Sequence, residues 1–215
     1  SSDDDIVSTA MAAIRALRED TGHEFHYMQR ERVYHAPDHI HMSRERKRGN
    51  LETLLKLVCG QSVEDGFTCF TVAPESLKGQ YRYVITLDSD TILPPGSALR
   101  MVGAMLHPLR QRREIGGRMR GVSIVQPRME VAAHSVGSLL SLLLGGRGGT
   151  DPYNALSSEF DNDICASGSF VGKGIIDPPA FLAATEGKII KGSVLSHDLL
   201  EGQLAGCAFS SDISL

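Results

Sequence analysis

Apolar residues recur along this chain at two spacings, and segments of the two kinds alternate. Steps of three and four residues predict helices at residues 6–17, 51–58 and 97–106, from about His134, near Phe181 and from Asp198. Short apolar runs predict strands at residues 25–27, 67–72, 83–87 and 122–125, and near Phe209. Gly60 fits the C-terminal cap of the second helix. Strands that alternate with helices are typical of an α/β sandwich with a mainly parallel central sheet.

The predicted strand at residues 83–87 ends in two carboxylates. Asp88 and Asp90 follow it directly, and a turn-forming Pro94-Pro95-Gly96 comes soon after. Residues two apart in a strand point to the same side, so the two carboxylates can converge on one point. Two carboxylates at the carboxyl end of a strand suit a hard divalent cation that is shared with substrate phosphates.

Composition limits the other possibilities. The chain has 215 residues, of which 41% are hydrophobic, and this is enough for one domain with a sizeable core. The net charge of −4 gives no general affinity for nucleic acid or anionic membranes. The longest apolar stretch, residues 136–144, is too short to span a bilayer. Four widely spaced cysteines indicate neither a zinc site nor a disulfide framework. We therefore expect a single domain, residues 1–215, from a reducing compartment.

Three further segments have two interpretations each. The basic turn at residues 44–51 opens a helix and suits an anion, or it is a solvated basic face. The glycine-rich residues 168–174 lack the spacing of a Walker phosphate loop, so they contact a ligand or form a turn at a sheet edge. Asp198 opens a predicted helix, where it serves as a general base or forms a capping box with Glu201.

Taken together, these segments resemble a known family. A basic KxGN helix start, a strand ending in DxD and a later aspartate at a helix start resemble glycosyltransferases of the GT-A fold. Six ordered stretches are similar to the glycosyltransferase domain of cyclic β-1,2-glucan synthases: ERKRGNLETL, YVITLDSDTILPPGSA, VQPRM, DPYNA, GSFVGKGIID and LSHDLLEG. The resemblance implies an inverting transferase that moves glucose from UDP-glucose onto a growing β-1,2-glucan, in a GT-A-like three-layer sandwich truncated at both ends.

The resemblance also implies roles for individual residues. Asp88 and Asp90 would hold Mg²⁺ or Mn²⁺ on the UDP diphosphate, and Asp198 would take the proton of the attacking hydroxyl. The KxGN stretch implies donor binding by Lys47, Gly49 and Asn50. Seven further residues fall on motifs expected near the sugar or acceptor: Gln126, Arg128, Gly168, Ser169, Phe170, Lys173 and His197. The remaining partners would be other domains of the same polypeptide, at the cytoplasmic face of a bacterial inner membrane, with this segment not itself membrane-spanning.

Some positions depart from the family pattern and leave alternatives open. Ala166-Ser167-Gly168 stand where the family has Gly-Glu-Gly, so a glutamate is missing near the expected acceptor site. This favours, as one alternative, an inactive domain that binds a sugar nucleotide or a partner. A second alternative is a haloacid-dehalogenase-type phosphatase, which also ends a strand in DxD. That family expects Thr or Val where Ile92 stands.

Overall fold

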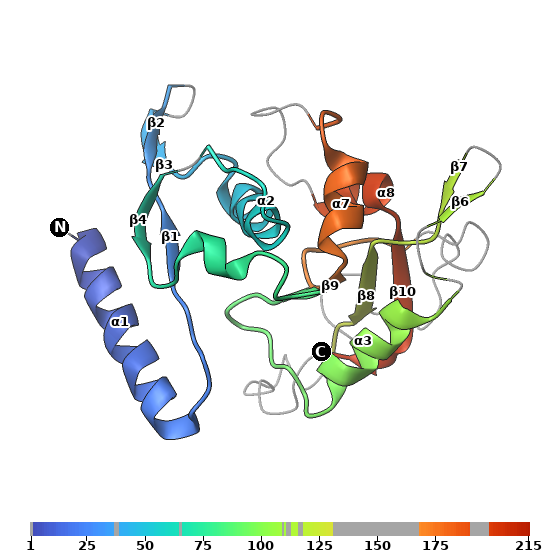
Figure 1. Ribbon diagram of the computed structural model, residues 1–215, viewed down its shortest axis with the longest axis horizontal. Coiled ribbons are helices and arrows are strands. Elements are labelled where there is room, and N and C mark those ends of the chain that lie inside the picture. Colours follow the sequence, from blue (N-terminus) through green and yellow to red (C-terminus); the bar gives the residue numbers. More distant parts are fainter. Residues whose placement is uncertain are drawn as a thin grey trace, which may run out of the picture. The chain divides into compact units, whose positions relative to one another are not determined.

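The computed structural model describes residues 2–36, 39–64, 66–108, 110, 113–115, 118–130, 168–189 and 198–215. Contacts between Cα atoms divide the chain into two compact units, Ser1–Tyr81 and Arg82–Leu215. Each unit is described by itself (Figure 1). The expectation of one catalytic domain over the whole chain stays a prediction.

The first unit contains small antiparallel sheets and two longer helices. Its elements are α1 (Ser2–Thr21), β1 (Met28–Arg30), β2 (Val33–His35), β3 (Ile40–Met42), α2 (Arg46–Val58), β4 (Phe67–Phe70) and a 3-10 helix (Pro74–Leu77). Strand β1 pairs with β4, and β2 pairs with β3. Helix α2 ends as expected, because Gly60 has a φ of +71° and donates its N–H to Leu57 O at 2.9 Å, while Gln61 N donates to Lys56 O at 2.8 Å.

The second unit contains the four-stranded sheet. Its elements are β5 (Val84–Thr86), α3 (Ser97–Leu106), β6 (Arg113–Ile115), β7 (Arg118–Arg120), β8 (Ile124–Arg128), β9 (Gly174–Ile176), α7 (Pro178–Thr185), α8 (Asp198–Ala205) and β10 (Cys207–Ser214). The strand order is β10-β8-β9-β5, with β10 parallel to β8 and β9 antiparallel to both neighbours. The α/β class is confirmed. The sheet is mixed, because β9 runs against the common direction of β5, β8 and β10.

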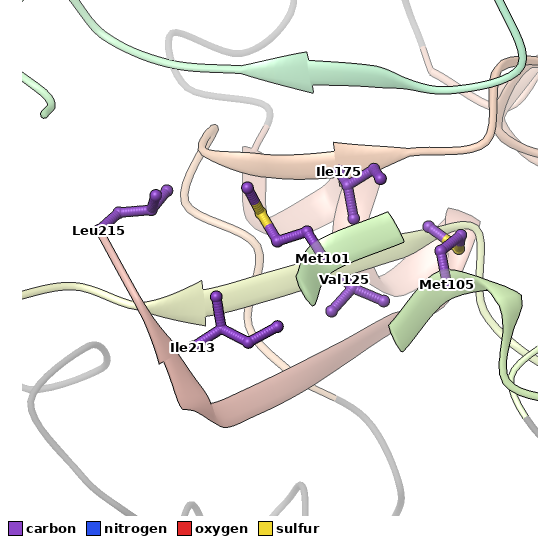
Figure 2. Packing of buried hydrophobic residues seen from close by; sticks show 6 residues of the cluster. All are labelled: Met101, Met105, Val125, Ile175, Ile213 and Leu215. Atoms are coloured by element: carbon purple, nitrogen blue, oxygen red, sulfur yellow. The ribbon is translucent and has the colours of Figure 1, made fainter. Parts of the chain in front are cut away.

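The core of this unit lies between α3 and one face of the sheet. Figure 2 shows its six fully or nearly fully buried side chains, which are Met101, Met105, Val125, Ile175, Ile213 and Leu215. Val125 and Ile175 are directly paired across β8 and β9. The neighbouring pair, Ile124 and Ile176, must point to the opposite face because side chains alternate along a strand. Both of these residues are also fully buried, so the sheet is covered on both faces.

Most of the predicted elements are confirmed, with two shifts. The expected strand at residues 25–27 is wrong: the Phe25 carbonyl accepts a hydrogen bond from the Arg18 side chain at 3.0 Å, and pairing starts only at Met28. The strand expected at residues 122–125 is displaced to Ile124–Arg128. The helix expected from His134 lies outside the described residues. Among the helices that the structure describes, none is long and apolar enough to cross a membrane.

Candidate functional site

The proposed metal ligands follow the end of β5. Asp88 is half-buried and Asp90 is exposed. The Thr91 N–H donates to the Asp88 carbonyl at 3.1 Å, which closes a turn immediately after the strand. Because the chain turns here, Asp88 and Asp90 both stay near the end of β5, at the edge of the sheet.

Two other predicted motifs reach the same edge. Strand β9 lies antiparallel between β5 and β8, so its first residue meets the carboxyl end of β5 and the middle of β8. Gly174, at the start of β9, pairs with Thr86 at the end of β5. A Cβ on Gly174 would also lie 2.4 Å from the Val125 carbonyl of β8, so only glycine permits this approach. The sheet topology thus brings together residues 88–90, 125–129 and 168–174, which are far apart in the sequence.

An ion pair joins two of these motifs. Lys173 Nζ lies 3.1 Å from Asp88 Oδ2, and the two side chains are 22% and 32% exposed. The sequence motifs suggested a place for Lys173 near the sugar or acceptor, but no direct partner. Its contact with Asp88 could not be foreseen from spacing alone, since it depends on the pairing of β5 with β9.

Gln126, one of the predicted site residues, has a structural role in the interior of the second unit. Its side chain is fully buried. Its Oε1 accepts the Val171 N–H at 3.2 Å, and its Nε2 donates to the Pro127 carbonyl at 3.0 Å. Gln126 therefore ties the glycine-rich segment to the middle of β8, and this segment carries Lys173. The expectation that Gln126 lies near the acceptor stays a prediction.

Helix α8 packs against the same segment. A Cβ added to Gly202 would lie 2.7 Å from Phe170 Cβ and 3.1 Å from Phe170 N, and Phe170 itself is fully buried. Asp198 is the first residue of α8 and stands four residues before Gly202. Residues four apart share one face of a helix, one turn apart along its axis. Asp198 thus begins the helix whose glycine contacts the Gly168–Phe170 stretch, and the Gly168 N–H donates to the Cys207 carbonyl of β10 at 2.6 Å.

The KxGN stretch forms the start of α2 in the first unit. Gly49 is buried, and a Cβ there would lie 2.3 Å from the Arg44 carbonyl and 2.8 Å from a guanidinium nitrogen of Arg30. Gly49 therefore has a packing role. Lys47 and Asn50 are exposed. These residues belong to a different unit from Asp88, so their participation in one donor site stays a prediction.

The remaining predicted residues have simpler outcomes. Arg128, at the end of β8, forms an ion pair with Glu130. Ser169 is half-buried next to Phe170. His197 lies outside the described residues. Gly202 was not predicted as a contact residue, although a glycine inside a short predicted helix could have indicated close packing.

The site has the chemistry for a hard cation that takes further ligands from substrate. Across the described ranges, no three His, Cys, Asp or Glu side chains gather in the manner of an all-protein metal site. Magnesium is commonly held by one or two carboxylates together with phosphate oxygens and water. Asp88 and Asp90 offer oxygen ligands of this kind, and Asp88 Oδ2 already faces a cationic ammonium group. The donor atoms of Asp88 and Asp90 are therefore of the type that Mg²⁺ or Mn²⁺ binds.

Comparison with known proteins adds one finding. No protein-family model matches the chain. Over 197 residues, 89% of its length, the chain is 36% identical to the cyclic beta-(1,2)-glucan synthase NdvB of Rhizobium meliloti (strain 1021). The chain is related to this synthase. It spans 7% of the synthase's length, so the relation concerns one segment of NdvB.

Proposed function

We propose that this chain is the glucosyltransferase domain of a cyclic β-1,2-glucan synthase. In this proposal it has a GT-A-like fold and transfers glucose, with inversion, from UDP-glucose to the growing glucan. The observation that carries the proposal is the 36% identity to NdvB over 197 residues. The meeting of Asp88, Lys173 and the glycine-rich segment at the end of β5 supports it. The domain would then act within a larger protein at the cytoplasmic face of a bacterial inner membrane.

The residues divide the chemistry into two tasks. Breaking the bond between glucose and UDP leaves negative charge on the diphosphate, and Mg²⁺ or Mn²⁺ on Asp88 and Asp90 would stabilise that charge as a Lewis acid. Asp198 would accept the proton of the attacking glucan hydroxyl. As the first residue of α8 it is carried by a helix that packs on the fully buried Phe170, which restricts its movement. A positioned base of this kind contributes about 10²–10⁴-fold to the rate.

Substitution of the two aspartates tests the proposal. We expect Asp90→Asn and Asp198→Asn, in the intact protein that carries this chain, to lower radiolabelled glucose transfer from UDP-glucose by about 10²-fold or more. Asp212→Asn is the matched control, because Asp212 is an exposed aspartate of β10 in the same unit. Transfer near the wild-type rate in either of the first two variants contradicts the assignment.

A binding measurement separates an active enzyme from an inactive relative. Calorimetric titration of UDP in the presence of Mn²⁺ reports whether the donor site exists, and the transfer assay reports turnover. Binding of UDP without any transfer by the wild-type protein would favour the alternative of an inactive sugar-nucleotide-binding domain. Hydrolysis of phosphate monoesters without dependence on UDP-glucose would favour a phosphatase.

A further inference from the structure

The ion pair between Lys173 and Asp88 occupies the carboxylate that the proposed function assigns to a metal ion. Lys173 Nζ is 3.1 Å from Asp88 Oδ2, within contact distance for oppositely charged groups. The Asp88 side chain is 32% exposed, so a solvated cation can reach it. A lysine ammonium group and a divalent cation at the same carboxylate repel each other, so the two cations compete for Asp88.

The backbone on both sides of Lys173 has little freedom to move the lysine away. Gly172 and Gly174 both have positive φ values, +81° and +145°. Gly174 is held against the Val125 carbonyl at a distance that excludes any side chain. On the other side, the Val171 N–H is bound to the buried Gln126. Relocation of the ammonium group must therefore come from rotation of the flexible lysine side chain, which has four methylene groups.

We propose that Lys173 is an exchangeable counter-ion that makes Asp88 selective for a metal ion bound to a nucleoside diphosphate over the free metal ion. This inference rests on the proposed function. Without ligand, the ammonium group neutralises Asp88 and competes with free divalent cations. When the metal arrives with a diphosphate, the metal takes the carboxylate and the ammonium group contacts the negatively charged diphosphate. Exchange of partners conserves the number of ion pairs, whereas free metal displaces the lysine without giving it a new one.

The proposal predicts effects of opposite sign on two ligands. Lys173→Met removes the competing cation but keeps most of the side-chain volume. We expect the Kd for free Mn²⁺, measured by electron paramagnetic resonance, to tighten about two- to fivefold, the range expected from a partly exposed ion pair. We expect the Kd for UDP at saturating Mn²⁺, measured by calorimetry, to weaken roughly tenfold, as for loss of a charge-assisted contact.

Two further variants serve as controls. Lys173→Arg keeps the positive charge and should remain near wild type for both ligands. Lys188→Met removes an exposed lysine elsewhere in the same unit and should change neither affinity. Thermal unfolding of each variant identifies any loss of folding. If Lys173→Met does not fold, Lys173→Arg is compared with the wild type instead. A change of more than twofold in the affinity of Lys173→Arg for either Mn²⁺ or UDP would then overturn the proposal.

The remaining outcomes are decisive as well. If Lys173→Met shifts both affinities in the same direction, or shifts only one or neither, the counter-ion role is wrong while the proposed function stands. If the wild-type protein binds neither Mn²⁺ nor UDP, the metal-dependent function itself fails, and this inference fails with it.

Discussion

The contact between α8 and Phe170 gives a sharp prediction for Gly202→Ala. Alanine in place of an exposed helical glycine normally stabilises a protein by about 0.5–1 kcal/mol, because it restricts the unfolded chain. At Gly202 the new Cβ would lie 2.7 Å from Phe170 Cβ, whereas ordinary van der Waals contact begins at 3.4 Å. One of the two elements must therefore move by about 3.4 − 2.7 = 0.7 Å.

Phe170 cannot yield this space easily. It is fully buried, and two of the three nearest atoms belong to its backbone. Overpacking of this kind costs about 1–3 kcal/mol, which outweighs the helix-propensity gain. We expect Gly202→Ala to lower the free energy of unfolding by about 0.5–2 kcal/mol. The proposed transfer activity should fall as well, because the displaced segment carries Lys173.

Gly103→Ala is the matched control, because Gly103 lies inside α3 and, apart from its chain neighbours and the backbone of its own helix, no atom lies within 4 Å of the position that an added Cβ would take. This variant should be stabilised by about 0.5–1 kcal/mol. Urea unfolding followed by far-ultraviolet circular dichroism measures both variants under the same conditions. Equal stabilisation of the two variants would show that α8 does not pack on Phe170, and Asp198 would then lose its link to the Gly168–Phe170 stretch.

Two further predictions concern polar side chains of the second unit. Gln126→Leu leaves the Val171 N–H without its acceptor and should lower the free energy of unfolding, measured in urea, by about 1–3 kcal/mol. The control Gln203→Leu, at an exposed position, should change the free energy of unfolding by less than about 0.5 kcal/mol. Equal effects of the two substitutions would contradict the role of Gln126. The Ser210 hydroxyl, which donates to the Asp212 carboxylate at 2.8 Å, lowers the pKa of Asp212 below the usual 3.8. The stability that this lowered pKa contributes is fully present above pH 3.8 and is lost as the pH falls through the lowered pKa of Asp212. Asp212→Asn should therefore be less stable than wild type by under about 1 kcal/mol at pH 7, and the difference in stability should vanish in acid. A difference in stability that grew in acid would contradict the direction of the pKa shift.

The long, regular elements were predictable because their signals are local. The helices that begin at Ser97 and Asp198 were expected at those residues, since both combine an apolar face with a recognisable start. Strands β2, β3, β6, β7 and β9 were not expected, since three residues are too few to show an alternation. Such strands exist because a partner strand supplies their hydrogen bonds, and sequence spacing does not contain that partner.

The candidate site was predicted in part. The strand that precedes Asp88 and the glycine-rich turn at residues 168–174 were both recognised, and the structure puts them at one edge of the sheet. The ion pair of Asp88 with Lys173 was not predicted, and neither was the burial of Gln126. Both depend on β9 running antiparallel between β5 and β8. The mainly parallel sheet that the alternation suggested did not include this strand.

The sequence by itself determined which residues are candidates for chemistry, because residue type and order fix the carboxylates after a strand, the lysine between two glycines and the aspartate at a helix start. Those features are covalent or local, and they need no fold to be seen. Only the tertiary structure decided which of them meet. Asp88 and Lys173 are joined because strand pairing acts across a separation of 85 positions (173 − 88), and the hydrogen bonds and burial that select this pairing arise only when the whole sheet forms.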